Sequence, residues 1–405
     1  MGENTGQLVE LEISNVAHGG IMVARHEGRV IFVSDAIPGE TVRAVITDDS
    51  QAKFWRADAV EVLVPSEHRQ EHVWSAASID REPADRAGGA EFGHITPEHQ
   101  RELKRRVLDD ALQRMAGLTT GVTVEAIDES ADGTGWRTRV RLHVSHDGTV
   151  GPFAARSHRV IPVTDLPLAT SAIVAAAALG TRVDPFAGAH IDIAETSGGD
   201  VLVLLESGKS RTIAETVGDR EFQLDARGFW QVHKRAATAL TSAVQSAIDP
   251  ELFDPKAPNL DLYGGVGLLA AAVGDRFGAT TRMTTVESDA AATEFASRNL
   301  AEWAGAEAVT ARVDRYLSRV QPEKSQYHSA TVVLDPPRSG AGKHVVNQLA
   351  SLGPAQVVYV ACDPVALARD LAQFALTGYR LSGIRAFDLF PNTHHIEAVA
   401  SLVRE

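Results

Sequence analysis

The second half of this sequence alternates between short apolar runs and stretches of helical spacing, and this alternation constrains the fold more than any other feature. Apolar runs typical of buried strands lie at 259–263, 283–287, 330–334 and 357–361. Helix-like stretches separate them, among them 265–274, 290–304 and 343–352. Because strands that alternate with helices pack as a parallel sheet covered on both faces, residues 226–405 are predicted to form a doubly wound α/β domain.

The first 225 residues lack this alternation and contain mainly strand-like segments. Residues 8–64 hold short β-branched runs separated by glycine turns, a pattern typical of a small β-barrel. Further along, one helical stretch at 168–180 interrupts a series of short predicted strands at 122–127, 138–144, 160–163, 190–194, 201–205 and 212–217.

Three regions follow from these patterns. We predict a barrel at 1–65, a mostly β central domain at 66–225, and the α/β domain at 226–405. A helix is expected at 97–116, because Thr96-Pro97 is a good helix start and apolar residues follow at helical spacing. This helix is a candidate to dock on the α/β domain.

The composition excludes several classes of protein. The chain contains a single cysteine among 405 residues, so no disulfide can form within it. No apolar run approaches the roughly 18 uncharged residues that span a bilayer. The sequence starts without the basic and apolar segments of a secretory signal, so a cytoplasmic protein without membrane attachment is predicted.

Charge is distributed unevenly along the chain. The net charge of −14 argues against nucleic acid as a partner, because phosphate binding depends on Lys and Arg. Between 136 and 160, however, five arginines stand against the single acid Asp147: Arg137, Arg139, Arg141, Arg156 and Arg159. Such a cluster indicates either a solvated basic face or a groove for a polyanion. A second basic cluster at 101–106, RELKRR, favours the groove.

The segment LDLYGGVGLLAAAV at 260–273 has the pattern of a buried strand, a glycine turn and a helix. Gly264, Gly265 and Gly267 allow the backbone to approach a ligand closely. The next predicted strand ends in Glu287, a carboxylate placed to accept both hydroxyls of a ribose. The usual G-x-G-x-x-G of dinucleotide binders is missing. The glycine turn together with the acid indicates a nucleoside ligand, either S-adenosylmethionine or a nicotinamide cofactor.

The motif VVLDPPRSG at 332–340 separates these two ligands. Paired prolines after Asp335 fix a rigid, non-helical wall at the end of a strand. Asp335 can meet the cofactor or the reacting base, and Arg338 can reach an anionic substrate. This arrangement favours a methyltransferase.

Cys362 directly follows the strand at 357–361 and precedes a predicted helix at 364–374. Most lone cysteines are inert and buried, but a helix N-terminus favours the reactive thiolate. Glu397 lies in an otherwise apolar strand, where desolvation would raise its pKa into a range useful for proton transfer. A solvent-facing edge position is the competing explanation for Glu397.

These two side chains have a clear joint use in pyrimidine chemistry. A thiolate that adds to C6 of uracil places electron density on C5, which can then accept a methyl group, and a base removes the C5 proton. His394-His395 could instead bind a metal, but no third ligand lies at a recognisable spacing, and no metal site is predicted.

The motifs together resemble the RNA uracil-C5 methyltransferases that modify tRNA or 23S rRNA. The matching segments are FWQVH (229–233), DLYGGVG (261–267), VES (286–288), DPPRSG (335–340), YVACDPVALARDL (359–371) and FPNTHHIEAVASL (390–402). GRVIFVSDAIPGE (28–40) resembles the family's TRAM barrel, and GWRTRVRLHV (135–144) resembles its central-domain strand. The resemblance implies a Rossmann-like class I methyltransferase domain preceded by an OB-like TRAM barrel and a mostly β central domain.

The resemblance also implies roles for individual residues. It makes Cys362 the nucleophile and Glu397 the base, it places Arg137, Arg139 and Arg141 on RNA, and it leaves Arg338 to contact the substrate. The implied S-adenosylmethionine contacts are Gln231, Tyr263, Gly265, Glu287, Asp314 and Asp335.

The expected function is methylation of uracil C5 in 23S rRNA, and three alternatives to it are open. A TRAM barrel favours rRNA because the family's tRNA members often lack one, but tRNA is an alternative. A second is a non-catalytic RNA-binding or ribosome-assembly factor. A third is methylation of an exocyclic amine, which needs no cysteine. No obligate protein partner is evident.

The sequence departs from some family members at an iron–sulfur cluster that four cysteines hold. The corresponding stretches are Ala87-Gly88-Gly89-Ala90 and Leu166-Pro167-Leu168. One cysteine cannot supply four ligands, so no cluster is expected.

Overall fold

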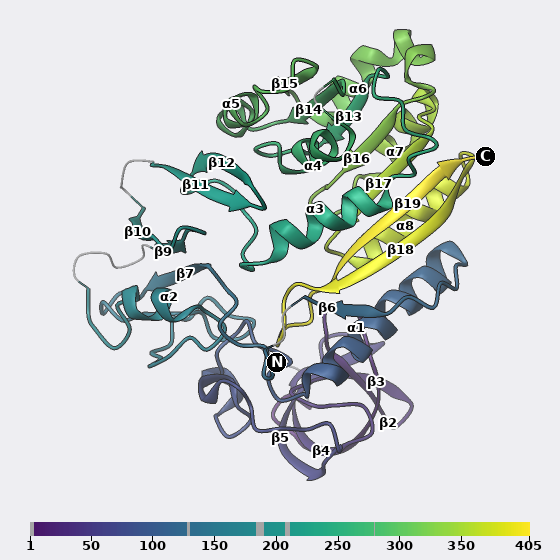
Figure 1. Ribbon diagram of the computed structural model, residues 1–405. Coiled ribbons are helices and arrows are strands. Elements are labelled where there is room, and N and C mark those ends of the chain that lie inside the picture. The colour runs from purple at the N-terminus through teal and green to yellow at the C-terminus, as the bar shows by residue number, and fades with distance from the viewer. Residues whose placement is uncertain (1–3, 128–129, 184–189, 207–210, 279) are drawn as a thin grey trace.

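The computed structural model describes residues 4–127, 130–183, 190–206, 211–278 and 280–405. Figure 1 shows a barrel at the bottom of the view, a central β region at the left, and a large sheet with its helices at the upper right. The predicted α/β fold with a preceding barrel is confirmed. No helix among the described residues is long and apolar enough to cross a membrane.

The described residues 8–64 form five strands that close the barrel in the order β1-β2-β3-β5-β4. In β1, Val9, Leu11 and Ile13 are buried while their neighbours face outward, which is the alternation expected for a barrel wall. The strands are β1 (Leu8–Val16), β2 (Met22–His26), β3 (Arg29–Ser34), β4 (Thr41–Asp48) and β5 (Phe54–Val64). A short turn at residues 17–21 joins β1 to β2.

The large sheet has eight strands within the described ranges, in the order β15-β14-β13-β16-β17-β19-β18-β6. The strands from β15 to β17 are parallel, whereas β19 runs antiparallel to both of its neighbours. Their bounds are β13 (Asn259–Leu262), β14 (Met283–Glu287), β15 (Ala306–Thr310), β16 (Thr331–Leu334), β17 (Gln356–Ala361), β18 (Tyr379–Asp388), β19 (Glu397–Arg404) and β6 (Val124–Ala126).

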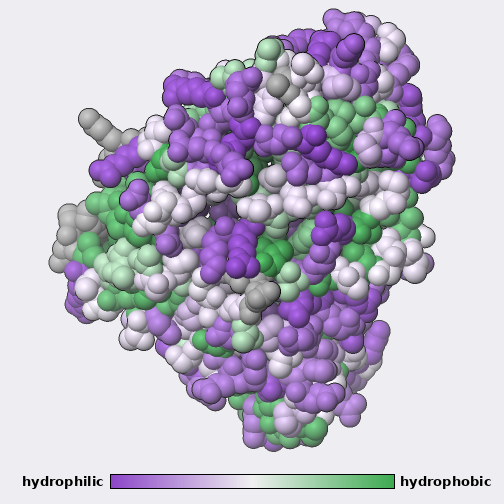
Figure 2. Space-filling model, viewed as in Figure 1, coloured by the Kyte–Doolittle hydropathy of each residue, from purple (hydrophilic) through white to green (hydrophobic). Residues whose placement is uncertain are grey.

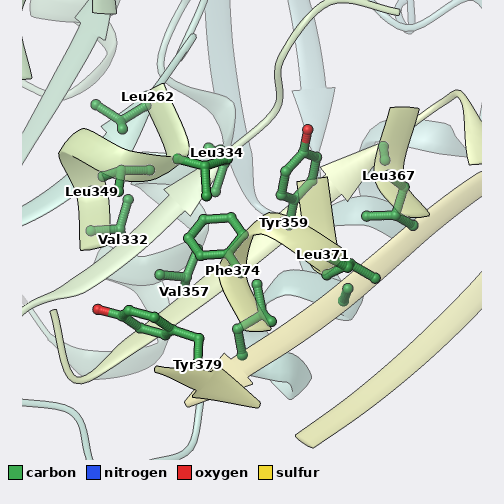
Figure 3. Packing of buried hydrophobic residues seen from close by; sticks show 14 of the residues in the cluster. Leu262, Val332, Leu334, Leu349, Val357, Tyr359, Leu367, Leu371, Phe374 and Tyr379 are labelled. Atoms are coloured by element: carbon green, nitrogen blue, oxygen red, sulfur yellow. The ribbon is translucent and has the colours of Figure 1, made fainter. Parts of the chain in front are cut away.

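Helices cover both faces of this sheet. Successive residues of β17 point to opposite faces, so Val357 and Tyr359 belong to one apolar cluster and Val358 to the other. Figure 3 shows the first cluster, where Phe374 packs edge-on against Tyr379. The helices are α3 (Ala236–Ala247), α4 (Leu268–Phe277), α5 (Ala290–Asn299), α6 (Val313–Val320), η4 (Gln321–Tyr327), α7 (Gly342–Leu352) and α8 (Pro364–Ala375).

Two segments expected outside the sheet domain pack directly on it. Residues 122–127 were predicted as a strand of the central domain, but β6 instead pairs with β18 and covers the exposed edge of the large sheet. Helix α1 (Pro97–Ala111), continued by η3 (Leu112–Ala116), buries Leu108 and Leu112 in the same apolar cluster as α8.

A buried ion pair fixes this helix. The side chain of Lys104 has no exposed surface, and its Nζ lies 2.5 Å from Asp388 Oδ1 and 3.0 Å from the carbonyl oxygen of Phe390. Burial lowers the pKa of Lys104, and the charge of Asp388 opposes that effect. Helix α1 therefore holds the end of β18, where the chain turns toward Glu397.

We expect Lys104→Met to lower the free energy of unfolding by about 3–5 kcal/mol, because it leaves the Asp388 carboxylate buried without its partner. Urea unfolding followed by tryptophan fluorescence measures this loss. Arg106→Met is the matched control, since it removes only an exposed pair with Glu102 on the same helix and should cost less than about 1 kcal/mol. Equal losses in the two variants would contradict this account of Lys104.

The central region is less regular than predicted. Its strands are β7 (Arg139–Val144), β8 (Val150–Gly151), β9 (His190–Glu195) and β10 (Val201–Leu205), in the order β10-β9-β7-β8, and the hairpin β11 (Thr212–Val217) with β12 (Arg220–Asp225). Its helical turns are η1 (Ser75–Ala77), η2 (Pro83–Asp85) and α2 (Ser171–Ala176). Helix α2 is shorter than the predicted 168–180, and the strand expected at 160–163 is reduced to one bridge between Phe153 and Val160.

Apolar packing holds the central region together. Ala87, Ala90 and Leu166, at the positions where the resemblance has cluster cysteines, are buried in one apolar cluster with Trp74 and Trp136. In Figure 2, hydrophobic residues gather at the left, over the region of β9 and β10, whereas hydrophilic residues cover much of the barrel at the bottom.

Candidate active site

The two predicted catalytic residues and several predicted cofactor contacts lie at one edge of the large sheet. Tyr263, Asp335 and Cys362 each follow the carboxyl end of a parallel strand, namely β13, β16 and β17. Glu397 begins the antiparallel strand β19, and Ala361 pairs with its neighbour Ala398. The start of β19 therefore lies beside the end of β17. The strand order reverses next to β13 and β16, and ligands of such sheets bind at this point.

The glycine turn after β13 has a left-handed backbone at three positions. Tyr263, Gly265 and Gly267 have φ values of 63°, 54° and 91°. A Cβ at Gly264 would lie 1.9 Å from Thr285 Oγ1, so only glycine fits there. At Gly265 an added Cβ would meet no atom within 4 Å, which shows open space beside the turn. Helix α4 starts only at Leu268, three residues later than predicted, because the turn extends through Gly267.

Glu287 is held against this turn. Its Oε2 accepts a hydrogen bond from the backbone N–H of Gly265 at 3.2 Å, and its Oε1 accepts from the N–H groups of Ser288 and Asp289. The carboxylate therefore has a fixed position beside the open space at Gly265. A fixed acceptor of this kind suits the hydroxyls of a ribose.

Asp261 is a site residue that sequence reasoning missed. Its Oδ2 accepts from the backbone N–H of Ala270 and from Thr285 Oγ1, while Oδ1 is buried without a hydrogen-bond partner among the described residues. Burial raises the pKa of Asp261 to about 7. The signal in the sequence was an acid in the middle of a buried strand, which is costly unless the acid is used.

The other predicted cofactor contacts are less enclosed. Asp314, at the start of α6, forms an exposed ion pair with Arg312 at 3.0 Å, which holds the pKa of this acid below its usual range. Burial, then the charge of Asp314, raises the pKa of Tyr263 to about 12, so the two side chains are electrostatic neighbours. Gln231 is half-buried in the loop that leads from β12 to α3.

The charges of Asp335 and Glu397 both act on Cys362, and the charge of Asp335 also acts on Glu397. Burial, with the charge of Asp261, raises the pKa of Asp335 to about 7. Glu397 is only 5% exposed, and burial together with the charge of Asp335 raises its pKa well above the ordinary value. The solvent-facing position considered for Glu397 is therefore wrong.

The expectation of a ready thiolate at Cys362 is also wrong for the protein without ligands. Burial, then the charges of Glu397 and Asp335, raise the pKa of the Cys362 thiol to about 12. Arg338 opposes this shift, as it does for Glu397. The start of helix α8 favours the Cys362 thiolate, but burial and the two nearby carboxylates disfavour it more strongly.

We therefore expect slow alkylation of Cys362 in the protein without ligands. Below the thiol pKa the thiolate fraction rises about tenfold per pH unit, so the iodoacetamide rate should climb from pH 7 to pH 10 without a plateau. Mass spectrometry follows the modification, and Cys362→Ala gives the blank because the chain has one cysteine. A plateau near pH 8 would contradict the raised pKa.

The loop between β18 and β19 is fixed from several sides. Buried Asn392 has φ 64°, its backbone N–H donates to Gln100 Oε1, and its side chain donates to the carbonyl oxygens of Asp132 and Gly133. Arg338 Nη2 lies 3.4 Å from His395 Nε2. Within the described residues, no group of three His, Cys, Asp or Glu side chains could hold a metal ion.

The three arginines predicted to contact RNA differ in their surroundings. Arg139 points inward: its Nη1 donates to the carbonyl oxygens of Ala226 and Gly228, and its Nη2 lies 3.8 Å from Glu215. We therefore remove Arg139 from the predicted RNA contacts. Arg141 is more than half exposed and pairs with Asp192, and Arg137 lines a cavity of about 520 Å³ in the central region.

The glycine turn after β13, the fixed acid Glu287 at the end of β14 and the buried acids at the sheet edge are the features of a Rossmann-like methyltransferase. Family models agree: the tRNA (Uracil-5-)-methyltransferase model matches residues 256–405, and the TRAM domain model matches residues 2–60.

Relatives match the whole chain. An RNA methyltransferase of Streptomyces avermitilis is 38% identical, over 98% of this chain and 98% of its own. One of Bifidobacterium longum is 32% identical, over 99% and 98%. The chain therefore belongs to the RNA methyltransferases of the tRNA (uracil-5-)-methyltransferase family. The crystal structure of Pyrococcus abyssi tRNA (uracil-54, C5)-methyltransferase with S-adenosyl-L-homocysteine has the same fold, with a TM-score of 0.71, 21% identity, and coverage of 99% of this chain and 100% of that chain.

Proposed function

We propose that this protein methylates C5 of a uracil in RNA, with S-adenosylmethionine as the methyl donor and 23S rRNA as the substrate. The observation that carries the proposal is the meeting of Cys362 and Glu397 at the sheet edge. Next to burial, the charge of Glu397 contributes to raising the pKa of Cys362, and Asp335 and Arg338 act on both side chains. Methylation of an exocyclic amine would not require this pair.

The residues present fit S-adenosylmethionine. The fixed Glu287 carboxylate beside the open space at Gly265 suits the ribose, and the unpartnered Oδ1 of Asp261 adds acceptor capacity behind the turn. Tyr263, Asp314, Asp335 and Gln231 complete the proposed contacts. When bound, the donor supplies an electrophilic methyl group and a positive charge. Positive charge lowers the pKa of nearby acids and thiols, which this site requires.

The protein's own residues perform the remaining chemistry. The Cys362 thiol loses its proton to solvent, and Sγ adds to C6 of the uracil, so that the electron pair of the C5–C6 double bond moves toward C5 and the C4 carbonyl oxygen. C5 then forms a bond to the methyl group while the methyl–sulfur bond of the donor breaks and its electron pair stays on sulfur. Glu397 as carboxylate next accepts the C5 proton. The electrons of that C–H bond restore the C5–C6 double bond, and Sγ leaves. The target base must be turned out of its stack, because both C5 and C6 have to be reached.

Basic residues at the protein surface and at the wall of the central cavity support RNA as the substrate. We propose Arg137, Arg141 and Arg338 as substrate contacts. Their positions are half-buried at the cavity wall, exposed on β7, and exposed beside His395 respectively. Removing any one should weaken RNA binding and reduce its salt dependence rather than abolish chemistry.

Transfer RNA is the second candidate substrate, because the Pyrococcus abyssi tRNA enzyme matches the chain along its full length. The N-terminal barrel, which is the feature that favours rRNA, therefore does not exclude tRNA. Mapping of 5-methyluridine in total RNA decides between them, in a strain that lacks this protein and in the same strain carrying wild type or Cys362→Ala. We expect one 23S rRNA position to lose the mark and only wild type to restore it. Loss in tRNA alone would establish the second candidate, and no loss in any RNA would contradict the proposal.

A further inference from the structure

The barrel reaches the candidate active site through one turn. His18, in the turn between β1 and β2, places its Nε2 2.8 Å from Asp363 Oδ2. Asp363 is the residue directly after Cys362. The hydrogen bond therefore joins two positions that are 345 residues apart in the sequence, one in the barrel and one beside the proposed nucleophile.

Asp363 passes this contact on to helix α8. Its other carboxylate oxygen, Oδ1, accepts a hydrogen bond from the backbone N–H of Ala366 at 2.8 Å and caps the helix. The same carboxylate thus binds both the barrel and the first turn of α8. One carboxylate oxygen of Asp363 bonds to His18 and the other bonds to Ala366. His18 and the helix therefore both fix the backbone next to Cys362.

The same turn contacts the loop that leads to Glu397. Gly20 has φ 72°, and a Cβ there would lie 2.2 Å from His394 Cβ and 3.0 Å from the ring of Phe92. The backbone of Gly20 therefore lies directly against His394, three residues before Glu397. Figure 1 shows this yellow loop between β18 and β19 reaching toward the barrel.

We propose that His18 is a positioning residue for methyl transfer, and that the turn at residues 17–21 makes the barrel a structural part of the active site. His18 acts through Asp363 on the nucleophile, and Gly20 acts through His394 on the segment of the base. This inference rests on the proposed function, and it assigns to the barrel a role in the rate of chemistry in addition to any role in RNA binding.

The charges of His18 and Asp363 predict whether the loss of His18 speeds or slows adduct formation. The hydrogen bond between the two side chains raises the pKa of His18, and it contributes, against the opposing effect of burial, to lowering that of Asp363. Without His18, the Asp363 carboxylate would keep only the first turn of α8 as its partner. Negative charge that is less well compensated beside Cys362 disfavours the thiolate, so adduct formation should become slower.

The first test measures single-turnover formation of the covalent RNA adduct and, separately, RNA affinity in the full-length protein. We expect His18→Ala to slow adduct formation about tenfold, the size of effect typical of one hydrogen bond to a charged group, with RNA affinity changed less than about twofold. His18→Gln, which can place an N–H donor near the position of Nε2, should recover most of the rate. A purely structural or RNA-binding role would not give this division between rate and affinity.

The second test uses matched glycine variants. Gly20→Ala and Gly28→Ala both place alanine at a positive φ, 72° and 80°, but only the Cβ at position 20 meets His394, because nothing lies within 4 Å at Gly28. We expect slower methyl transfer in Gly20→Ala than in Gly28→Ala at temperatures where both remain folded. Thermal unfolding of each variant establishes that range.

The outcomes separate this inference from the function on which it rests. A wild-type protein that forms no adduct and transfers no methyl group to RNA contradicts the proposed function itself. Active wild type with an unchanged rate in His18→Ala, or with a change in RNA affinity alone, overturns the positioning role. Equal rates in Gly20→Ala and Gly28→Ala overturn the second contact.

Discussion

Cys362→Ala is expected to abolish methyl transfer to RNA, with a loss of about 10⁴-fold or more, the scale seen when a covalent nucleophile is removed. C5 of uracil is too weak a nucleophile to react without addition at C6, and the chain has no second cysteine to substitute. Transfer of a radiolabelled methyl group from S-adenosylmethionine to RNA measures the activity. Denaturing electrophoresis of the same reactions shows whether a protein–RNA adduct forms.

Cys362→Ser is the matched control for the size of the side chain. Its hydroxyl fills the same space but ionises far less readily than a thiol, so this variant should also be inactive while remaining folded and able to bind RNA. Turnover by either variant at a rate near that of wild type would show that the thiol has no covalent role.

Glu397→Gln is expected to accumulate the methylated adduct and to lower turnover by about 10²–10⁴-fold, the usual contribution of a general base. Glutamine keeps the shape of the buried side chain but cannot accept the C5 proton. Adduct formation and methyl addition precede that step, so the RNA should remain attached to Cys362. Mass spectrometry of nuclease-digested adduct measures the mass of the attached nucleotide, including its methyl group.

Glu125→Gln supplies the comparison, because Glu125 lies on β6 in an exposed ion pair with Arg385. This variant should turn over without a trapped adduct. If Glu397→Gln released methylated RNA as fast as wild type, another group would have to remove the proton. If it formed no adduct at all, Glu397 would act before addition, for example on the thiol proton.

The parts of the fold that were predictable are those that depend on short, local sequence patterns. The strands β13, β14, β16 and β17 are short apolar runs, and their alternation with helices was sufficient to predict the doubly wound sheet. The glycine turn after β13 and the acid at Glu287 were predictable for the same reason, since each is local to one strand end. In the barrel, the alternation of β1 was equally direct.

The parts that were not predictable depend on pairing between distant segments. Nothing in residues 122–127 distinguishes a strand of the central domain from the partner that β18 requires at the edge of the large sheet. The buried pair of Lys104 with Asp388 and the contact of His18 with Asp363 are of the same kind. Their strength comes from burial or geometry, which a one-dimensional pattern does not contain.

Two predictions about side chains failed for a related reason. Arg139 looked like one of three equivalent basic residues, yet its guanidinium is directed into the protein, onto the carbonyl oxygens of Ala226 and Gly228. Cys362 looked activated by its helix, yet burial and two nearby carboxylates dominate its pKa. In both cases the role depends on neighbours that are distant in the sequence. Hydrogen-bond acceptors set the direction of the Arg139 guanidinium, and burial with nearby carboxylates sets the pKa of Cys362.

Release of hydrogen from C5 tests the central claim most directly. RNA carrying tritium at uracil C5 is incubated with the protein and S-adenosylmethionine, and tritium released to water is compared with methyl groups incorporated. The proposed chemistry predicts one tritium released per methyl group in wild type, and neither event in Cys362→Ala. Methyl incorporation with the tritium retained at C5 would show that another atom is methylated and would contradict the account.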